Sequence, residues 1–148
     1  MQIKFQKFCP EAKAPVRATD GSAGYDLFAV QVDYLPLCLL LCHSGIAVEI
    51  PRGYVGLLFP RSSIVKIEQR MSNAVGVIDS DYRGEITGVF DIRSTYSEDG
   101  FPRTPTVYRP GERFAQLVIV PIPDVEYIEV EELSETERGA GGYGSTGR

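Results

Sequence analysis

The sequence has few residues of the kinds that build metal centres or disulfide frameworks. It contains one histidine and three cysteines, and this odd number of cysteines shows no metal-type pairing. Cys38 and Cys42 lie within an apolar run, where we expect buried thiols rather than ligands, while Cys9 stands apart from them. His43 follows Cys42 directly, and we expect no chemical role for it. This set of residues favours a reducing compartment, the cytoplasm.

The sequence also lacks a long apolar run, a targeting segment and an excess of positive charge. Its longest apolar run, residues 35–42, contains a proline and is far shorter than the roughly 20 residues that span a bilayer. The first residues, MQIKFQKF, resemble neither a signal peptide nor a transit peptide. The net charge of -5 argues against a broad surface for nucleic acid or acidic membranes. We therefore expect neither as a partner, and any phosphate must be bound by a few placed arginines.

Long helical patterns, internal repeats and linkers are absent too. Short runs of β-branched and aromatic residues recur instead about every ten residues, with turn formers between them, which is typical of an all-β domain. Only residues 62–70 could form a short helix, and the polar residues 93–105 predict a protruding hairpin or loop. The expected strands include IKFQKF, GIAVEI, YVGLLF, NAVGVI, GEITGVFDI, TPTVYR, RFAQLVIVPI and VEYIEVEEL.

The 148 residues suffice for one domain with a substantial core. We predict that residues 1–137 form a jelly-roll-like β-barrel and residues 138–148 a flexible glycine-rich arm. The arm, RGAGGYGSTGR, matches two phosphate-loop patterns by its glycine spacing, but both loops need a following helix, and none follows here. It is either a disordered tail or an arm whose arginine, tyrosine, serine and threonine grip phosphate and stack on a base.

The segment GVIDSDYRGEI, residues 76–86, places two carboxylates after an apolar strand. We expect a β-hairpin whose turn carries Asp79 and Asp81. One interpretation is a solvated turn, because aspartate and serine are common turn residues. The other is that one carboxylate lies at the mouth of a pocket, where it can orient and deprotonate a water molecule.

Three further segments place polar residues next to apolar strands. In PRSSIVK, Arg61 with Ser62 and Ser63 could form a phosphate cradle, and one of the serines could also cap a short helix. In SAGYDLFA, Asp26 lies inside an apolar strand, where a carboxylate is costly unless it is paired or near a metal. In RFAQLVI, Gln116 lies among apolar neighbours. Taken singly, Asp26 and Gln116 are better explained as satisfied structural residues.

Together, five segments resemble the five motifs of the homotrimeric deoxyuridine triphosphatases (dUTPases). The resemblance covers residues 23–147, in the order SAGYDLFA, PRSSIVK, NAVGVIDSDYRGEI, RFAQLVI and RGAGGYGSTG. It implies a jelly-roll-like β-barrel and a homotrimer whose active sites are shared between chains. It also implies Mg²⁺-dependent hydrolysis of dUTP to dUMP and pyrophosphate by attack of water on the α-phosphorus. Such a reaction keeps uracil out of DNA and supplies dUMP.

The resemblance also implies a role for individual residues. Asp79 would activate the water and contact the 3′-hydroxyl, and Gln116 would lie beside the α-phosphate. Tyr82 would pack beneath the sugar, where a 2′-hydroxyl would clash. Asp26 would hold the water shell of Mg²⁺ as an indirect ligand. The uracil would be read by the backbone and side chains of Asn73, Gly76, Val77 and Ile78, and the phosphates would be cradled by Arg61, Ser62 and Ser63.

The arm would close over the bound nucleotide. Arg138 would grip the γ-phosphate and Tyr143 would stack on uracil, while Gly144, Ser145 and Thr146 would complete the contacts with the substrate. Ordering about ten residues costs on the order of 10–20 kcal/mol, whereas one stacked base returns roughly 1–3 kcal/mol. We therefore expect the arm to order only when all of its contacts with the nucleotide form.

Three features depart from the family pattern. Tyr143 stands where the family usually has phenylalanine, Lys66 comes one position early after the Arg-Ser-Ser segment, and residues 93–105 are longer than the minimal hairpin. Two other functions remain open. One is a dCTP deaminase or a bifunctional deaminase, which shares the fold and the Arg-Ser-Ser segment. The other is a non-catalytic regulatory module that uses residues 93–105 as its contact surface.

Overall fold

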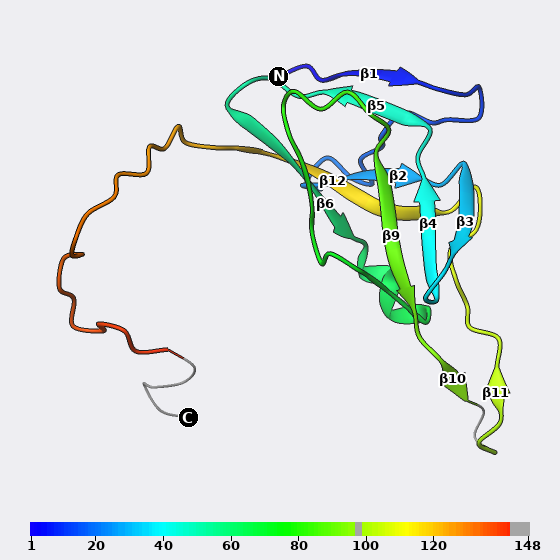
Figure 1. Cartoon of the computed structure of the whole chain (residues 1–148). Coiled ribbons are helices and arrows are strands. Elements are labelled where there is room, and N and C mark those ends of the chain that lie inside the picture. The colour runs from blue at the N-terminus through cyan, green and yellow to red at the C-terminus, as the bar shows by residue number, and fades with distance from the viewer. Residues whose placement is uncertain (97–98, 143–148) are drawn as a thin grey trace.

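The computed structural model of the chain describes residues 1–96 and 99–142, and its regular elements are strands and one short 3-10 helix. The prediction of an all-β fold is therefore confirmed. Figure 1 shows the elements in chain order. They are β1 (Lys4–Lys7), β2 (Tyr25–Phe28), β3 (Gln31–Leu35), β4 (Leu39–His43), β5 (Ile46–Glu49), β6 (Tyr54–Pro60), η1 (Ser62–Lys66), β7 (Gln69–Met71), β8 (Gly76–Ile78), β9 (Thr87–Ile92), β10 (Thr95–Tyr96), β11 (Pro102–Arg103) and β12 (Arg113–Pro121).

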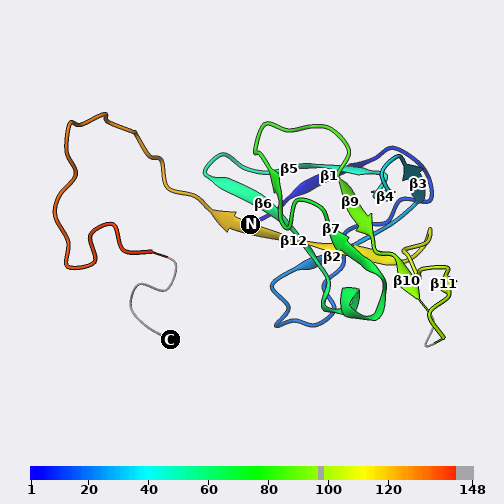
Figure 2. The same cartoon turned by 60° about the horizontal axis from the view of Figure 1, so that its bottom comes forward.

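Two four-stranded antiparallel sheets form the body of the molecule (Figures 1 and 2). The strand order is β2-β12-β6-β8 in one sheet and β3-β4-β9-β7 in the other. Alternate residues are buried on the central strands β4, β6 and β9, as Leu40 and Cys42 are on β4 and Leu58 is on β6. This alternation turns one face of each sheet toward a shared core. The arrangement agrees with the jelly-roll-like barrel that the sequence predicts.

Aromatic rings fill the centre of the core. Phe90 makes edge-to-face contacts with Tyr108 and Phe114, with ring centroids 5.0 Å and 6.3 Å apart. A Cβ atom on Gly88 would lie 3.0 Å from the rings of both phenylalanines, so the glycine leaves the space into which these rings pack. Such aromatic contacts stabilise the core beyond their buried area.

The short helix η1 ends sooner than expected, at Lys66 rather than Arg70, and β7 begins at Gln69. Arg61 occupies its N-cap position, and no side chain caps the helix there. The expectation that a serine caps this helix is therefore wrong. The backbone N–H of Ile64 donates instead to the carbonyl oxygen of Arg61, which leaves both serine hydroxyls outside the capping role.

Other expectations are also corrected. Asp79 does not lie in a β-hairpin, because β8 and β9 belong to different sheets; the loop between them crosses from one sheet to the other. Residues 104–109 and 125–133, which the sequence predicts as strands, form none. Conversely, the apolar run forms the tip and most of the second strand of an unpredicted hairpin of β3 and β4. Cys38 lies exposed at its tip with φ 58°, so only Cys42 is buried as expected, and burial raises the pKa of its thiol to about 12.

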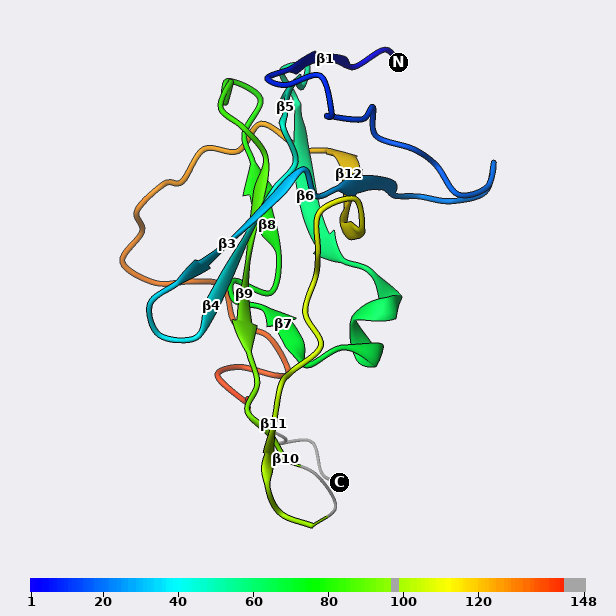
Figure 3. The same cartoon turned by 90° about the vertical axis from the view of Figure 1, so that its right-hand side faces the viewer.

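A small hairpin of β10 and β11 protrudes from the barrel (Figure 3). It confirms the prediction of a protruding hairpin or loop over residues 93–105, of which residues 97–98 lie outside the described part. Glu68 fixes its base, because the carboxylate pairs with Arg103 and accepts a hydrogen bond of 2.7 Å from the backbone N–H of Thr106. The hairpin is thus tied to the end of the loop that precedes β7.

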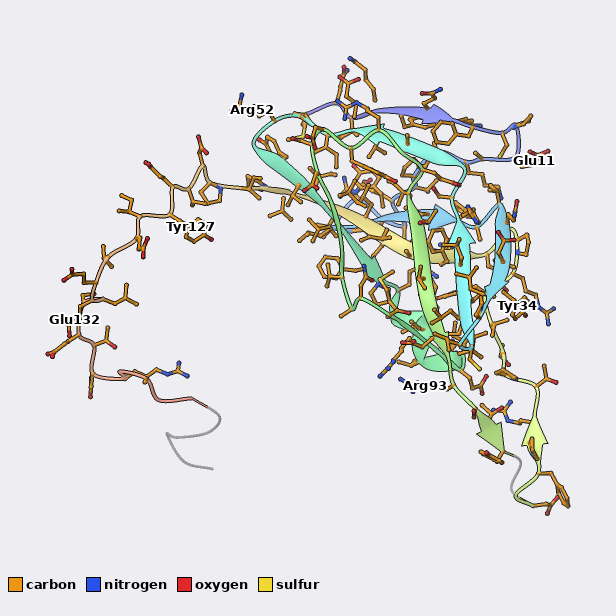
Figure 4. The ribbon with its side chains drawn as sticks, viewed as in Figure 1. Glu11, Tyr34, Arg52, Arg93, Tyr127 and Glu132 are labelled. Atoms are coloured by element: carbon orange, nitrogen blue, oxygen red, sulfur yellow. The ribbon has the colours of Figure 1, made fainter. Side chains whose placement is uncertain are left out.

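The chain leaves the barrel after β12. The backbone N–H of Ile122 donates to the carbonyl of Gly53, and residues 123–140 are exposed. Figure 4 shows Tyr127 and Glu132 on this segment, away from the two sheets. Within the described residues, no helix is long and apolar enough to cross a bilayer.

Candidate active site

A cavity of about 310 Å³ lies where β2, β6 and β12 meet the start of η1. Strand β12 lies between β2 and β6 and brings the residues of the cavity wall together. Gln116 on this strand is paired with Asp26 on β2 and with Phe59 on β6. The strand pairing thus gathers segments that are far apart in the sequence. The cavity is lined by Ala18, Ser22, Ala23, Gly24, Asp26, Phe59, Arg61, Ser62, Gln116 and Val118.

Asp26 is buried in this wall and carries two ion pairs. Its Oδ1 atom accepts a hydrogen bond of 2.8 Å from Nε of Arg61, and its Oδ2 atom accepts one of 3.1 Å from Nη1 of Arg113. The Asp26 side chain is only 9% exposed, so these guanidinium groups replace the water that the carboxylate loses. Arg61 also donates to the hydroxyl of Ser63 at 3.2 Å. The guanidinium is thereby fixed beside the cavity.

Arg113, the second partner of Asp26, was not predicted from the sequence. A signal was present, because a carboxylate in an apolar strand requires a partner. Arg113 opens the same strand as Gln116, and that strand pairs with β2. The sequence does not show that β12 pairs with β2, and this pairing brings Arg113 next to Asp26.

Gln116 is oriented by the backbone around it. Its Nε2 atom donates to the carbonyl oxygen of Pro60 at 3.1 Å. The amide oxygen faces Gly24, where a Cβ atom would lie only 2.5 Å from it. Glycine at this position therefore leaves room for the amide, whose oxygen is placed to accept a hydrogen bond at the cavity wall.

The loop of residues 79–85, here called the Asp79 loop, follows β8. Its first turn is closed by a hydrogen bond from the N–H of Tyr82 to the carbonyl of Asp79. Arg83 braces the turn by donating to the carbonyl oxygens of Ser80 and Tyr82 at 2.8 Å and 2.9 Å. The hydroxyl of Tyr82 donates to the carbonyl of Glu85 at 3.0 Å. These bonds give the loop a defined shape.

The turn before β8 carries the residues expected to read a base. Ala74 adopts φ 59°, and the N–H of Val75 donates to the carbonyl of Asn73 at 2.6 Å. Gly76 is buried, and a Cβ atom there would lie 3.1 Å from Cβ of Leu58. The turn is thus tight and packs closely on β6.

Strand β8 itself, with Val77 and Ile78, lies at the edge of its sheet. In the part of the chain that the structure describes, its one partner is β6. An edge strand presents backbone N–H and C=O groups on its outer side. Such groups are suited to recognise a planar base by its hydrogen-bonding edge.

Asp79 does not face Arg61 and Gln116 in the same chain. It lines a different cavity, of about 720 Å³, together with Asp81, Arg83 and Arg52. By strand register, Asp79 lies level with Val55 and hence with position 120 of β12. It is therefore roughly 15 Å from Gln116, given about 3.3 Å per residue and about 4.8 Å per strand. One chain thus holds two separate halves of the expected site.

Of the residues expected in the arm, Arg138 is described, and it lines neither of the two cavities. Nε of Arg138 donates to the carbonyl of Gly141 at 2.9 Å, and the side chain is exposed. Tyr143, Gly144, Ser145 and Thr146 lie outside the described residues. Among the described residues, no three or more histidine, cysteine, aspartate or glutamate side chains gather as metal ligands. A metal at this site would need ligands from the substrate or from water.

The chain is similar to known proteins in sequence and in structure. Residues 10–147 match the family model described as dUTPase. Over 147 residues the chain is 44% identical to the deoxyuridine 5′-triphosphate nucleotidohydrolase of Corynebacterium diphtheriae, covering 98% of this chain and 92% of that protein. The likeness spans all of the segments described above.

Solved structures agree. A variant of the Staphylococcus bacteriophage 80alpha dUTPase with dUpNHpp superposes with a TM-score of 0.80 at 30% identity, over 99% of each chain. A variant of the dUTPase from phage phi11 of S. aureus, which coordinates a structural Mg(II) ion, gives a TM-score of 0.71 at 27% identity, over 89% of this chain and 98% of that one.

Proposed function

The chain belongs to the dUTPase family and hydrolyses dUTP, and we propose how its residues carry out the reaction. Water attacks the α-phosphorus, the bond to the bridging oxygen breaks, and dUMP and pyrophosphate leave. The observation that carries the proposal is the cavity in which buried Asp26 fixes Arg61 beside Gln116. A fixed guanidinium and oriented amide are suited to bind phosphate oxygens without rearrangement.

Each residue of the cavity then has a defined task. Arg61 binds the phosphate chain with its guanidinium fork, and the hydroxyls of Ser62 and Ser63 donate to the same oxygens. The amide oxygen of Gln116 accepts a hydrogen bond from the attacking water. The hydrogen bond from Nε2 to the carbonyl of Pro60 orients the amide for this role, and the absence of a side chain at Gly24 leaves room for the oxygen. Asp79, supplied to the cavity from another chain, removes the proton from this water.

The base and sugar bind at the edge of β8. Backbone groups of Gly76, Val77 and Ile78, with the side chain of Asn73, pair with uracil. Cytosine presents the opposite hydrogen-bonding edge, so it would leave buried groups unpaired and bind poorly. Tyr82 packs beneath the deoxyribose, where a 2′-hydroxyl would clash. Selection of base and sugar thus comes from two adjacent segments.

The residues present fit Mg²⁺ that is held mainly by phosphate and water. Mg²⁺ keeps much of its water shell and takes few protein carboxylates beside substrate phosphates. Asp26 is the carboxylate of the cavity, and each of its oxygens accepts one guanidinium hydrogen bond, which leaves lone pairs for metal-bound water. When bound, the ion would neutralise the triphosphate and orient it for attack. Asp26 would hold it through water rather than directly.

We also propose a homotrimer in which each site combines the cavity of one chain, the Asp79 loop of a second and the arm of another. The separation of Asp79 from Gln116 within one chain supports this proposal. The segment after β12 supports it too, because its apolar residues are exposed on a single chain, as Tyr127 is at 96%. Exposed apolar side chains in such a row indicate a partner surface. The segment is long enough to carry Arg138 away from its own barrel.

In the cell, this activity would keep uracil out of DNA and supply dUMP. We propose a cytoplasmic location, because the three free cysteines persist in a reducing compartment. The acidic net charge of -5 disfavours binding to nucleic acid or anionic membranes.

The test is pyrophosphate release from dUTP, dCTP, dTTP and UTP, followed by analysis of the nucleotides for deamination. We expect release from dUTP to be much faster than from the other three nucleotides, no deamination, and a loss of activity when Mg²⁺ is chelated. Deamination of dCTP would support a deaminase, and inactivity toward all four nucleotides would support a non-catalytic module. Full activity in chelator would contradict the role of Mg²⁺.

A further inference from the structure

A histidine between two carboxylates lies beside the Asp79 loop. His43 lies at the end of β4. Its Nε2 atom is 3.1 Å from Oδ2 of Asp33 on β3, and its Nδ1 atom is 3.0 Å from Oε2 of Glu85. Glu85 is 42 residues away in the sequence, at the end of the Asp79 loop. The imidazole therefore ties that loop to the edge of the second sheet.

Glu85 is held at three points. Its Oε1 atom accepts a hydrogen bond of 2.6 Å from the backbone N–H of Gly45, its Oε2 atom pairs with His43, and its backbone carbonyl accepts the hydroxyl of Tyr82. The two side-chain contacts restrain the backbone of Glu85, because both oxygens of its carboxylate are hydrogen-bonded. The carbonyl that receives Tyr82 is fixed with it.

Tyr82 has few other restraints. The residue is 44% exposed, so packing against the core restrains the ring little. The ring lies over Gly84, where a Cβ atom would be 2.3 Å from the hydroxyl oxygen and 2.5 Å from Cζ. The hydrogen bond to Glu85 and the contact with Gly84 therefore decide the orientation of the ring.

We propose that Glu85 and His43 are positioning residues for Tyr82 and thereby help the enzyme to select dUTP over UTP. The inference rests on the proposed role of Tyr82 beneath the deoxyribose. A ring can reject a 2′-hydroxyl only if it cannot move aside, and a rejection by steric clash is lost when the clashing group is loosened. Glu85 supplies the fixed carbonyl, His43 holds Glu85, and Asp33 orients the imidazole from its other nitrogen.

The electrostatics of the cluster agree with this arrangement. The pKa of His43 is raised above its ordinary value, first because of the hydrogen bond to Glu85 and further because of the charge on Glu85 and the contact with Asp33. A protonated imidazole donates from both nitrogens at once, which matches its two carboxylate partners. The hydrogen bond to Asp33 holds the imidazole in the orientation that the hydrogen bond to Glu85 requires, and the bond to Glu85 does the same for the bond to Asp33.

The test compares kcat/KM for dUTP and UTP in Glu85→Ala, Glu85→Gln and His43→Phe. Glu68→Ala is the matched control, because Glu68 also accepts a backbone N–H and pairs with a basic side chain but lies by the protruding hairpin. We expect the preference for dUTP to fall by about 5-fold in Glu85→Ala and His43→Phe, the scale of one hydrogen bond. Glu68→Ala should retain the wild-type preference, and Glu85→Gln most of it, because its amide oxygen still accepts from Gly45.

Two variants of Tyr82 separate this inference from the function on which it rests. Tyr82→Ala should relax sugar selection more than any change at Glu85. Tyr82→Phe removes the hydroxyl, so adding Glu85→Ala to it should change the preference no further. If Tyr82→Ala relaxes the preference but Glu85→Ala lowers both activities equally, the positioning role is overturned. An unchanged preference in Tyr82→Ala overturns the role of Tyr82 and this inference with it.

Hydrogen–deuterium exchange gives a readout that does not depend on activity. Amides of the Asp79 loop should exchange about 5-fold faster in Glu85→Ala and His43→Phe than in the wild type, since the contacts that close the loop are lost. Amides of β12 should be unaffected in folded variants. Equal exchange in the Asp79 loop of Glu85→Ala and of the wild type would also overturn the proposal.

Discussion

The Nε atom of Arg61 lies 2.8 Å from the Oδ1 atom of Asp26, and this ion pair fixes the guanidinium in the wall of the cavity between β2, β6 and β12. The carboxylate comes from β2 and the guanidinium from the turn before η1. Because Arg113 pairs with the second oxygen of the same carboxylate, one buried anion orients two cations. The positive charge that we propose for binding the triphosphate is thus already fixed in the chain without substrate.

Asp26→Asn should weaken both the fold and the binding of substrate. The change keeps the size of the side chain but removes the charge between two guanidinium groups. We expect a loss of about 1–3 kcal/mol in the free energy of unfolding, because the arginines retain some access to water. KM for dUTP and the Mg²⁺ concentration needed for half-maximal activity should rise. Urea unfolding and steady-state kinetics measure these effects, with the exposed Asp20→Asn as control. Wild-type values for all three would contradict the role of this ion pair.

Asp79→Asn should retain nucleotide binding while hydrolysis falls by about 100-fold or more, the scale expected for the loss of a general base. Asp81→Asn is the matched control, since Asp81 lines the same cavity and should affect turnover much less. Calorimetric binding of a non-hydrolysable dUTP analogue and single-turnover hydrolysis separate the two effects. Unchanged turnover in Asp79→Asn would remove this carboxylate from the mechanism.

Gly24→Ala should lower kcat by displacing Gln116. The added methyl group would lie 2.5 Å from the amide oxygen, closer than any stable contact, whereas nothing lies within 4 Å of a methyl group at Gly21. Gly21→Ala is therefore the control. We expect kcat to fall by about 10-fold or more in Gly24→Ala, as for other misplaced catalytic groups, and to stay unchanged in Gly21→Ala. Equal kcat values for both variants would show that Gln116 does not orient the water.

The cluster around His43 predicts a dependence of stability on pH. The folded-state pKa of His43 is raised above 6.5 by Glu85 and Asp33. Its stabilising contribution is therefore fully present below pH 6.5 and is lost as the pH rises through the raised pKa. The difference in Tm between wild type and His43→Gln should shrink by about 2–4 °C over this window, which corresponds to roughly 1 kcal/mol. A Tm difference that does not change with pH would contradict the prediction.

The sequence predicted the parts of the fold and site that depend on local pattern. Alternating apolar runs indicated most strands of the barrel, and three of the five family-like segments contain residues that line the cavity, including Asp26, Arg61 and Gln116. The hairpin around Asp79 was wrong because turn residues mark a reversal but do not say which sheet receives the next strand. Residues 125–133 carry a strand pattern, yet a strand needs a partner, and none of the residues described in its own chain pairs with it.

Contacts between distant segments could not be predicted from one sequence. The pair of Arg113 with Asp26 depends on the register of β12 against β2. The contact of His43 with Glu85 depends on the register of β4 against β9, in which His43 lies opposite Thr87. Neither the arginine at position 113 nor the histidine at position 43 is unusual for its place in the sequence. Their roles follow from the pairing of strands, which local propensity does not determine.

The last prediction concerns which chain supplies each half of the site. Asp79 lies roughly 15 Å from Gln116 within one chain by strand register, too far to share one phosphorus atom. The exposed segment after β12 runs away from its own barrel through Tyr127 and Glu132 (Figure 4), and Arg138 follows it in the sequence. If sites form between chains, the Asp79 loop and the arm of any one site come from different copies.

Two inactive variants test this arrangement by mixing. One is Asp79→Asn, and the other is a chain truncated before Arg138. After they are denatured, mixed equally and refolded, a site is intact when its Asp79 loop comes from the truncated chain and its arm from the Asp79→Asn chain. Random assembly makes about a quarter of the sites intact, because two independent choices must both be right.

The activity of the mixture decides between shared and self-contained sites. Each variant refolded alone should be inactive, and trimers should be confirmed by their size in solution. If the loop and arm of a site came from the same chain, every site would carry one of the two defects, and the mixture would stay inactive. Recovery of about a quarter of wild-type activity supports the shared site, since only chains that complement one another can build it. Mixed trimers without activity would refute it.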